Sequence, residues 1–240
     1  RSASAKKSRK VIFPAITPCN SFCSAMGSKA RRTMADPFGK YDVYSVASSI
    51  YCYPDSSVLK NKLDIRDPAL LRKVEADLST ARQAEIFHTP VVGRFTATHL
   101  CNIHRKLLGD VYSFAGHFRR EDIAKGPTRF VTYSQIKEKL QRLLGQLQQE
   151  KWLENVPFEA FVARSAYYMA ELNYIHPFRE GNGRAIREFM RLLFLHNGYV
   201  VQWDAVDVEA LLNAMIDSVY DTAHLEQILK QCLVVAPDSR

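Results

Sequence analysis

The chain has 240 residues, of which 47% are hydrophobic and 11% aromatic, and its formal net charge is +8. These proportions are typical of a globular protein with one well-filled core, and they exclude an intrinsically disordered chain. No apolar run approaches the roughly 20 residues of a membrane-spanning helix, and the basic N-terminal residues lack the apolar stretch of a secretory signal. We therefore expect a soluble cytoplasmic protein.

The positive charge is concentrated at the N-terminal end of the chain. Residues 1–40 contain nine Lys and Arg but one acidic residue, whereas the remaining 200 residues carry no net charge. Residues 1–33 also lack helical or strand periodicity, so we interpret 1–33 as a flexible leader and 34–240 as the folded domain. Such an arm could hold nucleic acid loosely, but a solvated leader is the simpler interpretation.

The spacing of apolar residues predicts a mainly helical domain. Asp67-Pro68 is typical of a helix start, and Asn197-Gly198 of a helix end. The helices that we expect cover residues 57–63, 67–86, 96–109, 134–151, 157–173, 183–196, 205–219 and 222–234.

One segment, residues 123–133, interrupts the helical pattern. Gly126-Pro127 indicates a turn, and the following RFVTY has the β-branched and aromatic content of a strand. We predict a β-hairpin here and call residues 123–133 the flap. The predicted fold class is therefore all-α, a helical bundle with one small β-hairpin.

The sequence HPFREGNGRAIR, residues 176–187, contains the groups with the clearest chemical potential. Pro177 disfavours helical backbone at His176, so we expect this histidine on a loop just beyond a helix end, where it can face a substrate. Phe178 would point the other way and anchor the loop in the core.

A glycine-rich turn follows this loop and leads directly into a helix. Gly181-Asn182-Gly183 permits close approach of a ligand, and the N–H groups at the helix start form an anion site. Arg184 and Arg187 project from one face of that helix, and Glu180 is an oxygen ligand suited to Mg²⁺. Together with His176, these groups suit phosphoryl or nucleotidyl transfer from a nucleoside triphosphate and its metal.

Residues 176–187 resemble the signature of the Fic family, His-x-Phe-x-acidic-Gly-Asn-Gly-Arg-x-x-Arg, at every fixed position. The similarity extends over about residues 40–235 and includes IHRKLLGDVYSFAGHFR (103–119) and the flap. The resemblance implies a Fic-type helical bundle and a Mg-ATP-dependent protein adenylyltransferase. Such an enzyme transfers AMP from ATP to a Tyr, Thr or Ser hydroxyl of a target protein.

The resemblance also implies a role for each matched position. His176 would be the general base, and Glu180 would hold the Mg²⁺ that bridges the phosphates. The remaining groups would bind ATP: Gly181, Asn182 and Gly183 around the α- and β-phosphates, Arg184 at the β- and γ-phosphates, and Arg187 at the γ-phosphate.

Two roles fall to the flap. Lys125 and Gly126 would lie over the nucleotide, and Arg129, Phe130 and Val131 would offer an exposed strand edge to a loop of the target protein.

Many Fic proteins are inhibited by a helix carrying Ser/Thr-x-x-x-Glu followed by Gly or Asn. Ser134…Glu138 and Thr222…Glu226 have this spacing, but neither glutamate is followed by Gly or Asn. The short form that begins near Met34 is similar to the class inhibited by a separate small antitoxin protein. That class implies the toxin of a toxin–antitoxin pair, with bacterial type II topoisomerases among its targets.

Two alternatives remain open. A Fic fold can transfer another group, such as phosphate or UMP, although the retained Gly-Asn-Gly-Arg favours AMP. The chain could also be a non-catalytic module that uses its basic arm to bind nucleic acid or protein. Outside the motif we expect Arg191 to be a surface charge and His99, His104 and His196 to have packing roles, with Glu226 a weak candidate for self-inhibition.

Overall fold

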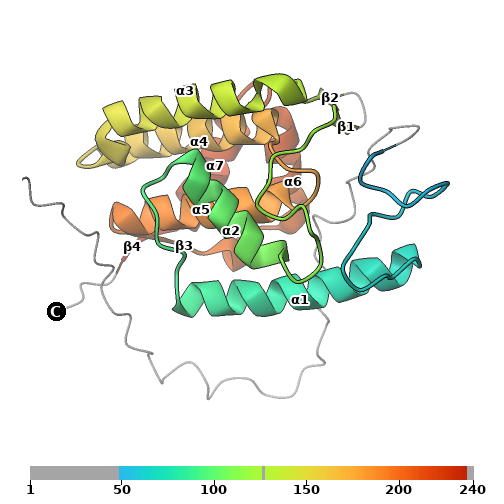
Figure 1. Ribbon diagram of the computed structural model, residues 1–240. Helices are drawn as coiled ribbons and strands as arrows, with labels where there is room; N and C mark the ends of the chain where they lie inside the picture. Colours follow the sequence, from blue (N-terminus) through green and yellow to red (C-terminus); the bar gives the residue numbers. More distant parts are fainter. Residues whose placement is uncertain (1–48, 126–127, 237–240) are drawn as a thin grey trace, which may run out of the picture. The chain divides into compact units, whose positions relative to one another are not determined.

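The computed structural model describes residues 49–125 and 128–236 (Figure 1). The predicted leader, residues 1–33, and Gly126 of the flap lie outside the described residues. The described part consists of α-helices and two short antiparallel strand pairs, so the all-α prediction is confirmed. Within this part, none of the helices combines the length and apolar content that crossing a membrane requires.

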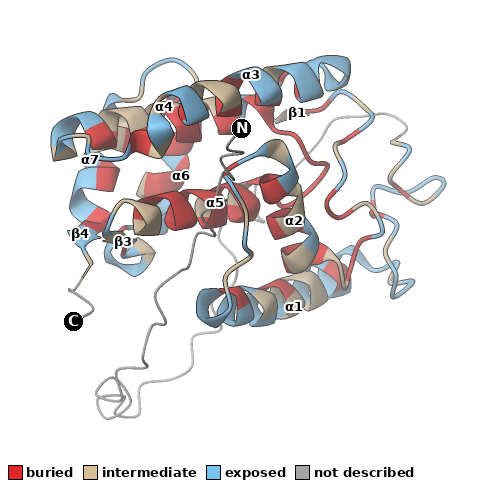
Figure 2. Cartoon of the chain, turned by 60° about the vertical axis from the view of Figure 1, so that its left-hand side comes forward, coloured by how far each residue is buried: buried red, intermediate tan, exposed pale blue. Residues whose placement is uncertain are grey.

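Helix α1 (Pro68–His88) begins as the sequence predicts. The Asp67 side chain accepts a hydrogen bond from the N–H of Leu70 at 2.6 Å, and Pro68 occupies the first turn. Most of this helix is exposed (Figure 2), and its buried residues are Leu71, Ser79 and Ile86. One face of α1 therefore contacts the rest of the domain.

Helix α5 (Asn182–His196) lies at the centre of the helical bundle. It packs against α2 (Ala97–Leu108), α4 (Phe158–Ile175) and the strand that follows it. Figure 2 shows α5 as a mostly buried helix, and nearly all of its residues from 184 to 194 are buried. Because α5 is mostly buried, its N-terminal end is fixed relative to the core.

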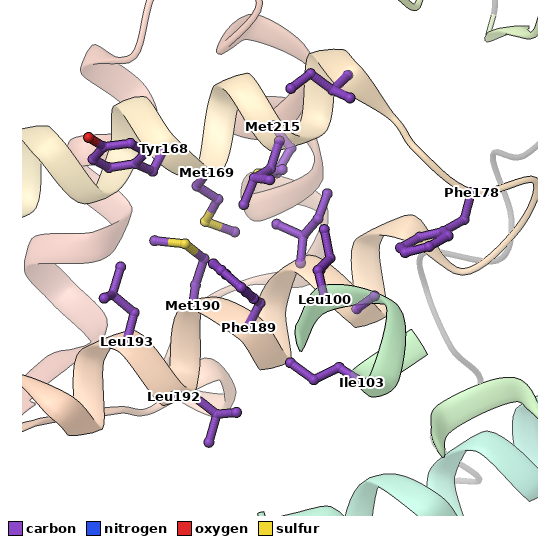
Figure 3. Packing of buried hydrophobic residues seen from close by; sticks show 14 of the residues in the cluster. Leu100, Ile103, Tyr168, Met169, Phe178, Phe189, Met190, Leu192, Leu193 and Met215 are labelled. Carbon is purple, nitrogen blue, oxygen red and sulfur yellow. The ribbon is translucent and has the colours of Figure 1, made fainter. Parts of the chain in front are cut away.

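The core around α5 is apolar and closely packed (Figure 3). Phe189 and Met190 of α5 meet Met169 of α4 and Leu100 of α2, and all four side chains are fully buried. Burying a side chain of this size contributes about 1.5–3 kcal/mol relative to leaving it exposed. The loop between α4 and α5 is thus anchored at both ends by core helices.

The remaining elements cover this core. Helix α3 (Ile136–Gln149) follows a 3-10 turn (Tyr133–Gln135) and packs on α4. A 3-10 turn (Lys151–Leu153) separates α3 from α4. After α5 come β3 (Tyr199–Val201), a 3-10 turn (Trp203–Ala205), α6 (Val208–Asp217), α7 (Ala223–Cys232) and β4 (Leu233–Val235). Strand β4 pairs antiparallel with β3, with Val234 opposite Val200. The prediction of one helix over residues 222–234 is therefore corrected, because α7 ends at Cys232 and Leu233 begins a strand.

The expected helix at residues 57–63 is also wrong. These residues form turns, and Leu59 makes an isolated bridge with Cys52. The side chain of Asn61 explains the difference: its Nδ2 donates to the carbonyl of Ile65 at 2.7 Å, and its Oδ1 accepts from the N–H of Ile65 at 2.9 Å. A side chain that satisfies the local backbone in this way competes with helix formation.

The flap is a hairpin, but a shorter one than predicted. Strand β1 (Ala124–Lys125) pairs antiparallel with β2 (Thr128–Arg129). Beyond Arg129 the backbone turns towards α4, because the N–H of Val131 donates to the carbonyl of Tyr174 at 3.3 Å. Strand pairing therefore ends before the RFVTY segment is complete.

Candidate active site

The loop between α4 and α5 places His176 at the C-terminal end of α4. Its N–H donates to the carbonyl of Leu172 at 3.1 Å, and its backbone is left-handed, with φ 47° and ψ 62°. A left-handed residue is a common way to end a helix, although it is strained for a residue other than glycine. His176 thus lies directly beyond the helix, where the sequence placed it.

Two contacts of the His176 imidazole help to fix its orientation. Nδ1 lies 3.0 Å from the carbonyl oxygen of Asn173, and the ring of Phe130 stacks on the imidazole at 3.8 Å between ring centroids. Because a carbonyl can only accept, Nδ1 carries a proton in this hydrogen bond, and in the neutral ring the lone pair is then on Nε2. The histidine is 6% exposed, and its geometry is that of a proton acceptor.

Glu180 and Gly181 form the corner at which the loop enters α5. The N–H of Gly181 donates to Oε1 of Glu180 at 2.9 Å, and the carbonyl of Glu180 accepts from Nε2 of His104 at 2.8 Å. Gly181 has φ 75°, and a Cβ added there would lie 2.2 Å from Cδ1 of Leu108. Only glycine fits this corner, which keeps the Glu180 carboxylate beside the start of the helix.

Asn182 closes the loop with its side chain. Its Oδ1 accepts from the N–H of Phe178 and its Nδ2 donates to the carbonyl of Phe178, both at 2.8 Å. Phe178 itself is fully buried and stacks on the His104 ring at 3.8 Å, and Figure 3 shows it on the loop that joins α4 to α5. The amide of Asn182 therefore braces the loop, so any contact of this residue with a phosphate would come from its backbone.

Arg184 is buried and paired with α1. Its Nη2 lies 2.5 Å from Oε1 of Glu75, its Nη1 donates to Oγ of Ser79 at 2.9 Å, and Oε1 of Glu180 is 3.7 Å away. The hydroxyl of Tyr112 donates to the other oxygen of Glu75. Burial and the nearby carboxylates raise the pKa of Tyr112, so the phenol stays protonated as a donor.

Arg187 lies near the first turn of its own helix. A Cβ added at Gly183 would lie 3.2 Å from Nη1 of Arg187, so the guanidinium passes close to the Gly183 backbone. Arg187 is half-buried, whereas Arg184 is 5% exposed. The two arginines of the motif thus differ: one is fixed by α1, and the other lies over the helix start.

The flap residues have separate environments. Lys125 belongs to β1 and is half-buried, and Arg129 at the end of β2 is exposed. Phe130 stacks on His176, and Val131 is 5% exposed with its backbone hydrogen-bonded. The expectation that Arg129, Phe130 and Val131 together form an exposed strand edge is therefore corrected, because Val131 is part of the core and strand pairing ends at Arg129.

Several residues that matter here were not identified from the sequence. His104, which we expected to have a packing role, bridges the N–H of Gly116 at Nδ1 and the carbonyl of Glu180 at Nε2, both at 2.8 Å. Burial lowers the pKa of His104 to about 3, so it is neutral. Arg191 is not a surface charge: it is 9% exposed and holds Glu188 in a two-pronged ion pair.

The site combines a proton acceptor, a carboxylate, a helix start and two guanidinium groups. Among the described residues there is no group of three or more His, Cys, Asp and Glu side chains that could hold a metal ion. Glu180 lies at the helix start with one oxygen fixed by Gly181. One oriented carboxylate fits Mg²⁺, which commonly takes its other ligands from water and substrate phosphates.

Comparison with known proteins identifies related sequences. The model of the Fic/DOC family matches residues 94–194. The protein adenylyltransferase VbhT of Bartonella schoenbuchensis is 39% identical over 186 residues, which make up 78% of this chain and 39% of that protein. A probable protein adenylyltransferase Fic of Salmonella typhimurium is 36% identical over 176 residues, 73% of this chain and 84% of that protein. The chain thus spans most of one relative but well under half of the other.

Solved structures share the fold. The Bartonella tribocorum effector protein BepC with bound AMPPNP has a TM-score of 0.71 and 26% identity, covering 78% of this chain and 97% of that one. The N-terminal Fic domain of a putative cell filamentation protein from Bartonella quintana, with bound ADP, has a TM-score of 0.72 and 26% identity over 78% and 95% of the two chains.

Proposed function

The chain belongs to the Fic/DOC family, and from this premise we propose that it is a protein adenylyltransferase that transfers AMP from ATP to a hydroxyl of a target protein. The observation that carries the proposal is the hydrogen bond from Nδ1 of His176 to the carbonyl of Asn173. It leaves Nε2 as a proton acceptor beside a helix start that suits phosphate groups.

We assign the proton transfer to His176. The hydroxyl oxygen of a Tyr, Thr or Ser of the target attacks the α-phosphorus of ATP, and its proton passes to Nε2. The bond from the α-phosphorus to the bridging oxygen breaks, and pyrophosphate leaves with that electron pair. A positioned general base typically contributes 10²- to 10⁴-fold to such a step.

ATP binding falls to the helix start and its neighbours. The backbone of Gly181, Asn182 and Gly183 surrounds the phosphates, and Arg187, which passes close to Gly183, reaches the γ-phosphate. Glu180 would hold Mg²⁺, which would supply positive charge at the phosphates.

Arg184 and the flap make the remaining proposed contacts with the nucleotide. Arg184 contributes positive charge near the β- and γ-phosphates from a position fixed by Glu75. Lys125 of the flap covers the nucleotide, and Arg129 and Phe130 meet the target. Supporting this arrangement, Phe130 lies against the imidazole that receives the proton.

We propose that the chain acts in the cytoplasm and that its partner is a separate small antitoxin. The proposal of an antitoxin is supported by the sequence, in which no Ser/Thr-x-x-x-Glu is followed by Gly or Asn. Glu226 lies on α7, where its carboxylate accepts a hydrogen bond from Thr222 at 2.8 Å. The chain is then the toxin of a pair, and bacterial type II topoisomerases are the targets to test first.

Labelled ATP tests the proposed reaction. The full chain is incubated with Mg²⁺, ATP and purified bacterial type II topoisomerases, with a bacterial protein extract as a second acceptor. Label in the α-phosphate should remain on protein, and label in the γ-phosphate should leave with pyrophosphate. The proposal fails if only γ-label is retained, and His176→Ala must abolish the α-label while ADP still binds.

A further inference from the structure

Arg119 precedes the flap in sequence but contacts the loop that holds the proton acceptor. Its side chain is fully buried. Nε donates to the carbonyl of His176 at 2.8 Å, and the backbone N–H of Arg119 donates to the carbonyl of Pro177 at 2.8 Å. One residue therefore supports the backbone on both sides of the bond between His176 and Pro177.

These contacts lie where the backbone is strained. His176 is left-handed, and the last turn of a helix has carbonyls without partners inside the helix. Nη2 of Arg119 donates to one of these, the carbonyl of Ile175, at 3.4 Å. A positive side chain at the C-terminal end of α4 also has a favourable interaction with the helix dipole. Arg119 thus stabilises the conformation that presents the imidazole.

The same guanidinium also contacts both sides of the flap. Nη1 donates to the carbonyl of Glu121 at 2.8 Å, ahead of β1, and Nη2 donates to the carbonyl of Val131, beyond β2. Asp122 lies 3.7 Å from Nη1, and its Oδ1 accepts from the N–H of Tyr133 at 2.7 Å. The guanidinium of Arg119 therefore binds both the base of the flap and the His176 loop.

We propose that Arg119 is a positioning residue that fixes His176 and the base of the flap in one geometry, so that the target hydroxyl meets Nε2 correctly. The inference rests on the proposed function of His176. Arg119 acts through the backbone carbonyls it binds. Its planar fork of donors suits several carbonyls at once, a geometry that the single ammonium of lysine does not reproduce.

The test compares Arg119→Lys and Arg119→Gln with Arg164→Lys in the full chain. Arg164 is a suitable control because it belongs to α4, whose C-terminal end Arg119 contacts, and because it also makes hydrogen bonds through its guanidinium. It holds Glu150 through two of them, at 3.0 and 2.6 Å. Three quantities are measured for each variant: AMP transfer, ADP affinity by calorimetry, and the ring tautomer of His176 by NMR of protein with ¹⁵N-labelled histidine.

Both Arg119 variants should lose the fixed Nδ1–H tautomer of His176 and transfer AMP about 100-fold more slowly, as expected of a small displacement of a reacting group. Their ADP affinity should change no more than that of Arg164→Lys. A purely structural role would lower the melting temperature but leave the tautomer and the rate of the folded fraction unchanged. That result would overturn the inference.

If the Arg119 variants do not fold, a second measurement on the unaltered chain tests the inference. The Nε–H proton of Arg119 should exchange with D₂O much more slowly than that of the exposed Arg72, because it is buried and bonded to the carbonyl of His176. Equal exchange rates would overturn the inference.

The two proposals can fail separately. Retention of only γ-label disproves AMP transfer but leaves the tautomer result intact. An unaltered tautomer alongside retained α-label disproves the role of Arg119 alone.

Discussion

The guanidinium of Arg184 is paired with the carboxylate of Glu75, with Nη2 2.5 Å from Oε1, although the two residues are 109 positions apart in the chain. Their side chains are 6% and 14% exposed. Glu75 also accepts a hydrogen bond from Tyr112, so α1 fixes the orientation of an arginine that we propose binds phosphate. An outer helix thereby contributes to the candidate active site.

Replacing Glu75 by Gln should destabilise the fold and strengthen nucleotide binding. Removing one partner of a buried ion pair costs about 3–5 kcal/mol, and we expect a value near 3 kcal/mol because Gln retains a hydrogen-bond acceptor. ADP should bind more tightly, because one negative charge is removed from beside the phosphate site. Urea denaturation and calorimetry measure the two effects.

Glu85→Gln is the matched control on the same helix. Glu85 pairs with Arg82 and Lys106 at the surface, where ion pairs contribute little. It should leave both stability and ADP affinity nearly unchanged. Equal ADP affinity in Glu75→Gln and the unaltered chain would contradict the expected effect on binding.

Local signals predicted much of the fold. The Asp67-Pro68 start of α1, the end of α4 at His176 and the entry into α5 depend on backbone preferences that adjacent residues determine. The predicted helix at 57–63 failed because Asn61 binds nearby backbone groups, a local competition that apolar spacing does not reveal.

Long-range contacts account for what the sequence did not reveal about the site. Glu75 and Arg119 meet the motif only in the folded chain, and neither has a local pattern that points to these partners. His104 was recognised as a packing residue, but its bond to the carbonyl of Glu180 joins positions 76 apart. The pairing of β3 with β4 is also a long-range contact. The sequence did not predict it, because a short apolar run fits a helix end as well as a strand.

Gly181→Ala should be far more damaging than Gly198→Ala. Both glycines are left-handed, with φ 75° and 79°, so each substitution carries a backbone cost of about 1–2 kcal/mol. At Gly181 the new methyl would also lie 2.2 Å from Cδ1 of the buried Leu108, whereas at Gly198 no atom lies within 4 Å. Overpacking should add about 1–3 kcal/mol.

The difference between the free energies of unfolding of the two variants, measured by denaturation, separates the cost of the overlap with Leu108 from the cost of the left-handed backbone. Gly181→Ala should also weaken ADP binding, because the displaced corner carries Glu180 and the start of α5. Equal stability of the two variants would show that Leu108 moves aside without cost.

Phe130→Leu should slow transfer without weakening ADP binding. The ring of Phe130 stacks on His176 with an angle of 16° between the planes, and such a pair contributes about 0.5–1.5 kcal/mol beyond its buried area. Leucine keeps most of the apolar volume but loses the stack, so the transfer rate should fall up to about tenfold. Phe87→Leu, at an exposed position of α1, is the control and should leave the rate unchanged. A rate for Phe130→Leu equal to that of the control would rule out a role for stacking.

The buried histidine His104 should make stability depend on pH. Its Nδ1 accepts the N–H of Gly116, so the native state requires the neutral ring, and burial lowers its pKa to about 3. The unfolded chain has an ordinary histidine pKa near 6.5 and therefore binds one more proton between these values.

The free energy of unfolding should consequently fall as the pH is lowered from about 6.5 towards 3, by up to about 1.4 kcal/mol per pH unit from this group. His104→Gln can replace a donor and an acceptor but does not titrate. Urea denaturation at pH 7, 6 and 5 should therefore show a shallower pH dependence in His104→Gln than in the unaltered chain. Other groups, including His99, whose pKa burial also lowers, contribute equally to both proteins and cancel in the difference. Parallel curves would mean that His104 takes up its proton in the folded state as readily as in the unfolded chain, and that the bridge from Gly116 to Glu180 does not depend on a neutral ring.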